Sequence, residues 1–214
     1  MLNMGSIREE QDLTARANIR NSALRLFAER GHDAVTVREI ATAARVSPGL
    51  VLHHFGSKEG LRVAVNDHAV ESFDAIFVEF DDDELAEMLA GGEANSSLAE
   101  VFVRVFPAGS PLPAYLRRLL LTNDPTGAVL FGRLYSTTRR ILEAMLERGV
   151  ASPTEDPAVR AAFLVANDLA VILLRNQIAT AIGEDPLTPV GLDRWTRDVT
   201  AVYTEGAFKA PPKE

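Results

Sequence analysis

Residues 46–58 read VSPGLVLHHFGSK and contain the signals that begin and end one short helix. The Ser47 hydroxyl can accept a hydrogen bond from a free backbone N–H, and Pro48 suits the first helical position because its φ angle is already helical. Gly56 can end this helix, and Ser57 can cap the next one. The stretch therefore predicts a short helix over residues 48–55, with a second helix directly behind it.

A capping box lies just before this stretch. In Thr36-Val37-Arg38-Glu39 the threonine hydroxyl and the glutamate carboxylate can each satisfy a free backbone N–H, which predicts a helix over residues 37–44. Its small residues Ala41 and Ala44 allow a neighbouring helix to approach closely. Because Ser47 begins that neighbour after a short turn, the two helices form a helix-turn-helix candidate.

The rest of the chain also carries helical patterns. Sustained alternation of apolar and polar residues is missing, and apolar residues recur at helical spacing almost everywhere. We expect an all-α fold, in which a long helix joins an N-terminal three-helix head to a C-terminal helical domain. The expected helices cover residues 14–30, 37–44, 48–55, 57–79, 85–90, 97–106, 114–122, 125–150, 157–182 and 189–208. The expected regions are a flexible N-terminus (1–13), a helix-turn-helix domain (14–60), a helical domain (61–208) and a disordered tail (209–214).

Charge is distributed unevenly along the chain. The 214 residues have a net charge of −8, which by itself argues against a nucleic-acid partner because phosphates attract Lys and Arg. Residues 1–60 nevertheless carry +1, and the remainder carries −9. The two parts therefore have different electrostatic tasks.

Composition excludes several classes of protein. The chain has no cysteine, so disulfides, thiol catalysis and thiolate metal sites are excluded. We expect a cytoplasmic protein without a membrane partner, since no apolar run approaches the ~18 residues of a membrane span and the N-terminus lacks a signal-peptide pattern. No catalytic motif is present, and the neighbours His53 and His54 point in directions too different to share a metal ion. We therefore expect no enzyme activity, no metal and no cofactor.

The head resembles the DNA-binding domain of the TetR family of transcriptional regulators over about residues 14–62. The matching motifs are LFAERG, TVREIA, VSPGLV and HHFGSKEGL. The resemblance implies that the short helix enters the DNA major groove while the helix before it and the start of the helix after it hold phosphates. The DNA-binding residues that it implies are Thr36, Arg38, Ser47, Pro48, Gly49, Leu50, Leu52, His53 and Lys58, with Arg16 as a weaker candidate.

Leu52 and His53 stand where the family usually has two aromatic residues, commonly tyrosines. A tyrosine there packs on the sugar-phosphate backbone and donates its hydroxyl, whereas Leu52 has no donor. Leu52 could contact a thymine methyl group or pack on the head, and the sequence leaves both open. Arg38 is the guanidinium nearest to this helix, so we expect much of the specificity to come from dimer spacing and DNA shape.

The resemblance also implies a homodimer, a palindromic operator and a small-molecule effector of unknown identity. The apolar helix at residues 158–183 and the helix containing Trp195 would form a four-helix interface with their copies, although the first could simply be a central core helix. The candidate effector-pocket residues are Phe73, Phe77, Phe102, Phe106, Tyr115, Phe131, Tyr135, Phe163 and Asn167. The implied function is a ligand-responsive regulator, most often a repressor.

Three other interpretations stay open at this point. The protein could activate transcription, it could be a helical enzyme or carrier that kept the head, or it could be an interaction protein whose head no longer binds DNA. Leu52 is the main reason for the last of these.

Overall fold

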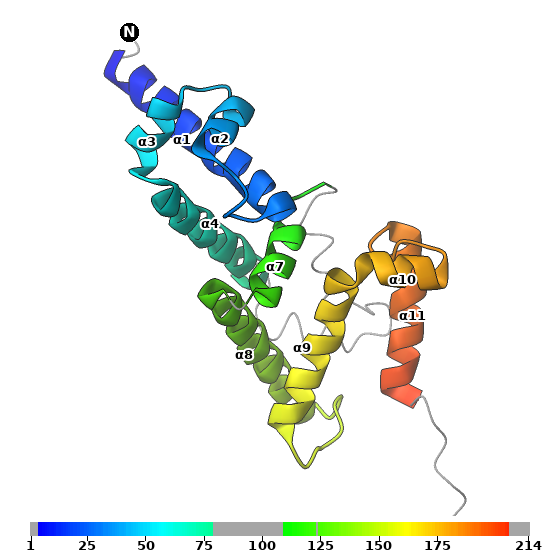
Figure 1. The fold of residues 1–214 in the computed structure, drawn as a ribbon. Coiled ribbons are helices and arrows are strands. Elements are labelled where there is room, and N and C mark those ends of the chain that lie inside the picture. Colours follow the sequence, from blue (N-terminus) through cyan, green and yellow to red (C-terminus); the bar gives the residue numbers. More distant parts are fainter. Residues whose placement is uncertain (1–3, 79–108, 123, 206–214) are drawn as a thin grey trace, which may run out of the picture. The chain divides into compact units, whose positions relative to one another are not determined.

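The computed structural model describes residues 4–78, 109–122 and 124–205, and every regular element within them is an α-helix (Figure 1). The expected all-α fold is confirmed. The helices are α1 (Met4–Arg30), α2 (Val37–Ala44), α3 (Pro48–Phe55), α4 (Lys58–Val78), α7 (Leu112–Leu121), α8 (Pro125–Glu147), α9 (Pro157–Leu173), α10 (Arg175–Ile182) and α11 (Pro189–Glu205). The helices expected at residues 85–90 and 97–106 and the tail at 209–214 lie outside the described residues.

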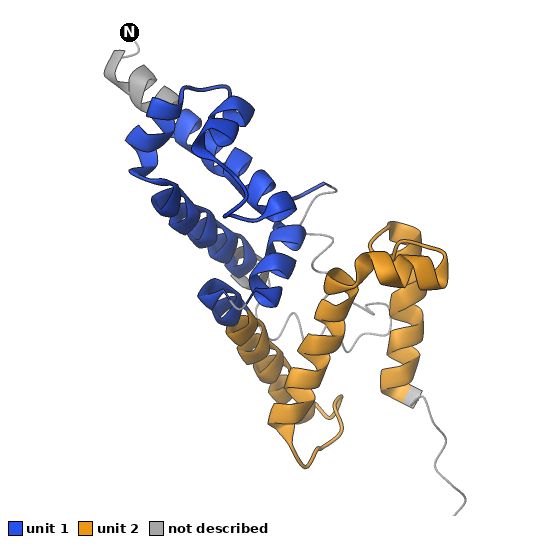
Figure 2. Ribbon diagram, in the orientation of Figure 1, with its two compact units in different colours: residues 1–74, 109–130 blue, residues 75–108, 131–214 orange. Residues whose placement is uncertain are grey.

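The chain divides into two compact units (Figure 2). Unit 1 comprises residues 1–74 and 109–130, and unit 2 comprises residues 75–108 and 131–214. Helices α4 and α8 each belong partly to both units, so the expected division after residue 60 falls inside α4. Unit 1 therefore contains more than the three-helix head, because α7 and the start of α8 belong to it.

The core of unit 1 forms around α1. Ile19, Ala23 and Phe27 recur at helical spacing, and all three are completely buried. The small residue Ala44 lets the end of α2 approach α1, where the Asn18 side chain donates a hydrogen bond to the Ala44 carbonyl at 2.8 Å. The helix begins at Met4, before the expected start at residue 14.

Helix α7 packs against the C-terminal end of α1 within unit 1. Its Arg118 guanidinium donates to the carbonyls of Ala28 and Glu29, which are in the last turn of α1, at 3.4 and 3.2 Å. Gly31 follows with a φ of 83°, and a Cβ atom there would lie 2.9 Å from Arg118 Nη1. Glycine at this position thus allows both the left-handed turn and the close approach of the arginine.

The single helix expected at residues 157–182 is wrong, because the helix breaks at Leu174. Leu174 has a φ of −109° and a ψ of 19°, and α9 and α10 meet there with a bend of 78°. Arg175 makes two hydrogen bonds to Asp185 at 2.8 and 2.6 Å, which anchor the start of α10 to the loop that follows it. Among the described residues no single helix is long and apolar enough to cross a membrane. The bent pair α9 and α10 would together have the length and the apolar composition of a membrane span.

Candidate nucleic-acid interface

The predicted capping box at the start of α2 is confirmed. The Thr36 hydroxyl accepts from the Glu39 backbone nitrogen at 3.3 Å, and the Thr36 nitrogen donates to Glu39 Oε2 at 2.7 Å. Arg30 at the end of α1 pairs with the other oxygen of Glu39 at 2.8 Å. Hydrogen bonds from the Thr36 side chain, the Thr36 backbone and Arg30 lower the pKa of Glu39 to about 2. The start of α2 is thereby fixed, with Thr36 and Arg38 exposed on it.

The turn between α2 and α3 depends on Arg45, a residue that no sequence pattern singled out. Its φ of 58° places it in the left-handed region, where it is the sole residue other than glycine among those described. Its backbone N–H reaches back to the Thr42 carbonyl at 3.1 Å, and Val46 donates to Ala41 at 2.9 Å. A turn this tight needs a left-handed residue, which is usually glycine. Because no glycine stands between Ala44 and Ser47, a residue with a side chain has to take that conformation.

Helix α3 is positioned by its cap and by one buried side chain. The Ser47 hydroxyl accepts from the Leu50 nitrogen at 3.2 Å, and Val51 is completely buried. The outward side of α3 is small or neutral, which lets the helix lie close to base edges but leaves it few groups for direct readout. Of the predicted contact residues on this helix, Pro48, Gly49 and His53 are exposed, Leu50 is half-buried, and Leu52 has 45% of its surface exposed.

The two adjacent histidines have different environments. His54 has only 4% of its side chain exposed, and its Nε2 atom lies 3.6 Å from the Asp12 carboxylate, whereas His53 faces solvent. The two ring centroids are 5.5 Å apart. Within the described residues no three metal-ligating side chains form a group that could hold an ion.

Lys58 is the first residue of α4 and lies beside the loop between α1 and α2. Its Nζ atom is 3.5 Å from the Asp33 carbonyl oxygen. Ser57 caps the helix by accepting from the Gly60 nitrogen at 2.9 Å. A lysine next to the N-terminus of a long helix combines a positive side chain with the positive end of the helix dipole, which is a favourable arrangement for a phosphate.

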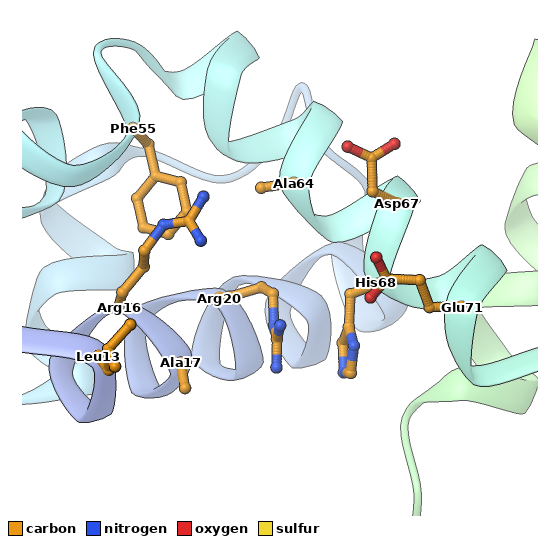
Figure 3. A pocket seen from close by; sticks show the side chains of 9 residues that line it. All are labelled: Leu13, Arg16, Ala17, Arg20, Phe55, Ala64, Asp67, His68 and Glu71. Carbon is orange, nitrogen blue, oxygen red and sulfur yellow. The ribbon is translucent and has the colours of Figure 1, made fainter. Parts of the chain in front are cut away.

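A cleft of about 310 Å³ opens between α1 and α4 (Figure 3). Its walls carry both signs of charge. In Figure 3, Arg16 and Arg20 project from α1, while Asp67 and Glu71 stand on α4. The Arg16 guanidinium lies 5.3 Å from the centre of the Phe55 ring, a cation–π contact that holds it at the end of α3. Arg16 therefore lies at the edge of this cleft next to α3, the helix that carries most of the expected DNA-binding residues.

The candidate pocket residues fall in different parts of the molecule. Phe73 and Tyr115 are buried in unit 1. In unit 2, Phe131, Tyr135 and Asn167 are half-buried and Phe163 is exposed. Phe102 and Phe106 lie outside the described residues, as does the side chain of Phe77, whose backbone belongs to α4. The effector pocket stays a prediction.

Comparison with known proteins places this geometry in a family. Residues 19–65 match the family of bacterial regulatory proteins described as the tetR family, and residues 108–208 match a tetracyclin repressor-like C-terminal domain. The chain is 35% identical over 153 residues to the HTH-type transcriptional regulatory protein RaaS of Mycobacterium tuberculosis, covering 72% of this chain and 67% of that protein. The chain belongs to the TetR family of transcriptional regulators.

Two further proteins resemble this chain, one over the head alone and the other over most of the fold. The HTH-type transcriptional repressor Rv3405c of Mycobacterium tuberculosis is 50% identical over 52 residues, which cover 24% of this chain and 28% of that repressor. The crystal structure of PfmR from Thermus thermophilus has a TM-score of 0.61 at 21% identity and covers 90% of this chain and 96% of that one, so it shows the shared fold. The present TetR-family chain is a DNA-binding transcriptional regulator.

Proposed function

We propose that this regulator is a homodimer that represses transcription by binding a palindromic operator, and that a small-molecule effector releases it. The observation that carries this proposal is the capped helix-turn-helix, in which the exposed α3 stands along the chain between Thr36 and Lys58, the two positions expected to hold phosphates. The protein acts in the cytoplasm, where its operator is found, and has no enzymatic role. Activation instead of repression is the alternative outcome at the same operator.

The proposed contacts to DNA are of two kinds: phosphate contacts that position the head, and base contacts that recognise the sequence. Lys58 and the start of α2 hold phosphates, which sets the register of α3 on the duplex. Gly49, Leu52 and His53 lie against base edges, and Leu52 can meet a thymine methyl group. Because α3 carries no arginine, direct readout is sparse, and the spacing of two heads supplies much of the specificity.

The dimer forms through α9 and α11. On α9, Val159 and Phe163 are one helical turn apart, with 63% and 59% of their surfaces exposed, so both lie on one apolar stripe. Tyr203 on α11 accepts a hydrogen bond from the Asn167 side chain on α9 at 2.8 Å, which ties the two helices together. An apolar stripe of this kind, joined to a second helix, suits a four-helix interface with a second copy.

The effector acts through the C-terminal helices. Of the candidate residues, Phe131, Tyr135 and Asn167 all lie in unit 2 and would supply two aromatic rings and one amide to a pocket there. The −9 charge beyond residue 60 keeps that part away from DNA. The dimer is proposed to have two arrangements of its heads, one that fits the operator and one that does not. The effector must bind the second arrangement more tightly, because only a difference in affinity shifts the equilibrium between the two. The released arrangement differs in the separation of the two α3 helices, which α4 controls.

Selection of DNA fragments from a random pool by the purified full chain tests this function. The selected fragments should contain two inverted half-sites, and affinity measured by fluorescence polarisation should fall with salt by a log–log slope of about −0.9 per phosphate contacted. A reporter gene placed behind the selected sequence then separates repression from activation. Failure to select any sequence would contradict DNA-binding by the head and favour the interpretation as an interaction protein.

A further inference from the structure

Arg62 connects the start of α4 to the start of α8 within unit 1. Its Nε and Nη2 atoms donate to Glu59 in the first turn of α4 at 2.9 and 2.5 Å, and Nη1 donates to Asp124 Oδ2 at 3.0 Å. The other oxygen of Asp124 accepts from the Thr126 nitrogen at 2.9 Å. One carboxylate thus caps α8 and holds α4 at the same time, and this ion pair is mostly shielded from solvent.

Asn66, one helical turn after Arg62, makes a second connection from α4 to α7 and α8. The Asn66 side chain donates to the Thr126 hydroxyl at 2.8 Å and accepts from the Tyr115 hydroxyl at 2.6 Å. Asn66 and Tyr115 are both buried, and burial raises the pKa of Tyr115, so its hydroxyl keeps the proton that it donates. All three polar groups have partners, as buried polar groups require.

The α7–α8 corner that receives these bonds is itself tightly packed. Gly127 is buried in the first turn of α8, and a Cβ atom there would lie 2.5 Å from the Leu119 carbonyl oxygen of α7. The backbones of α7 and α8 therefore touch, and no side chain could enter between them. A movement of this corner would be passed on to its hydrogen-bond partners, because tightly packed backbones deform little.

We propose that Arg62 and Asn66, held by Asp124, Tyr115 and Thr126, form a clamp that ties α4 to the α7–α8 corner and so sets the orientation of α4, with Lys58 at its start, against DNA. This inference rests on the proposed function, because it concerns where the DNA-binding residues are held. Arg62 and Asn66 are positioning residues that touch no DNA.

Each of three variants removes one connection of the clamp with little change of volume. Tyr115→Phe deletes one hydroxyl, Thr126→Val deletes another, and Asp124→Asn keeps a helix cap while removing the charge that Arg62 binds. Thr122→Val is the matched control, because its hydroxyl donates to the Arg118 carbonyl of α7 at 2.8 Å and, among the described residues, takes no part in the clamp. Each clamp variant should change the position of α4 more than the control does, as judged by the two measurements below.

The first measurement is a distance distribution between spin labels attached at Arg25→Cys on α1 and Glu71→Cys on α4. Both positions are exposed, and the chain contains no cysteine of its own, so the labels attach only where intended. The clamp variants should broaden or shift this distribution, whereas Thr122→Val should leave it unchanged. A narrow, unshifted distribution in all clamp variants would overturn the proposal. This readout needs no DNA, so it holds even if the proposed function fails.

The second measurement uses the selected operator and a copy with one base pair inserted between the half-sites. The unaltered chain should prefer the original spacing, and each clamp variant should lose about fivefold of that preference, the equivalent of one hydrogen bond, with an unchanged salt slope. A lower melting temperature with full spacing preference would show that the clamp is merely structural. If the unaltered chain selects no operator while the labels report a loosened α4, the proposed function fails and the positioning of α4 by the clamp stands.

Discussion

Glu39 in α2 and Arg30 in α1 form an ion pair of 2.8 Å, although Glu39 also closes the capping box of its own helix. The carboxylate therefore links the start of α2, where Thr36 and Arg38 are exposed, to the last turn of the longest helix in unit 1. The contact thus ties the start of α2 to the end of α1.

Acid should weaken this contact. The pKa of Glu39 is lowered from an ordinary 4.5 to about 2, so the stability that it contributes is present above pH 4.5 and is lost as the pH falls towards 2. Between these pH values the melting temperature of the unaltered chain should fall more than that of Glu39→Gln, measured by circular dichroism. Glu29→Gln, which removes an exposed charge from α1, serves as the control. Parallel curves for Glu39→Gln and the unaltered chain would contradict the prediction.

Lys58→Ala should weaken binding to all DNA sequences alike, because a phosphate contact carries no sequence information. The log–log slope of affinity against salt should become smaller in magnitude by about one contact. Arg117→Ala removes an exposed positive charge from α7 and should leave the slope unchanged. The measurement is fluorescence polarisation over a salt series, and an unchanged slope for Lys58→Ala would remove this lysine from the DNA-binding set.

Leu52→Tyr should strengthen operator binding. The leucine is 45% exposed and has no donor, whereas a tyrosine adds a ring and a hydroxyl that can reach the backbone of the DNA. A gain of about two- to tenfold corresponds to one net hydrogen bond. Leu52→Phe adds the ring without the hydroxyl and should show a smaller gain. Equal affinity for the tyrosine variant and the unaltered chain would indicate that this position faces away from DNA.

Arg118→Met should destabilise unit 1 by about 1–2 kcal/mol, since it removes two hydrogen bonds that usually contribute about 1 kcal/mol each. Methionine keeps the apolar stem but cannot donate to the Ala28 and Glu29 carbonyls at the end of α1. Urea denaturation should show a lower midpoint with the same slope. Arg117→Met, at the neighbouring exposed position, is the control. It should lower the free energy of unfolding by less than half as much as Arg118→Met does.

Phe163→Asp should dissociate the proposed dimer, since it places a charge on the apolar stripe of α9. Sedimentation velocity would show the monomer at concentrations where the unaltered chain is a dimer. Val129→Asp introduces the same charge on α8 at a residue that is 48% exposed, and it should leave the dimer intact. A dimeric Phe163→Asp chain would exclude this stripe from the interface and would favour a different role for Phe163, such as lining the effector pocket.

Sequence reasoning was most informative where one short segment contains its own start and stop signals. Thr36 with Glu39, and Ser47 with Pro48, predicted the starts of α2 and α3 because a helix cap involves residues only two or three positions apart. The expected helix over 157–182 failed because its apolar pattern continues across Leu174. Beyond the break, α10 is anchored by the bond between Arg175 and Asp185, which lies ten residues further along the chain.

Local spacing and composition predicted the all-α class and the helix-turn-helix, and the resemblance to the TetR family implied the nine residues with which this motif is expected to meet DNA. Three-dimensional packing was needed to show that the His54 side chain is buried while His53 is exposed, and that Asn66 meets Tyr115 across 49 positions of the chain. A hydrogen bond between distant residues leaves no periodic signal in a single sequence, because packing, and not spacing, brings its partners together.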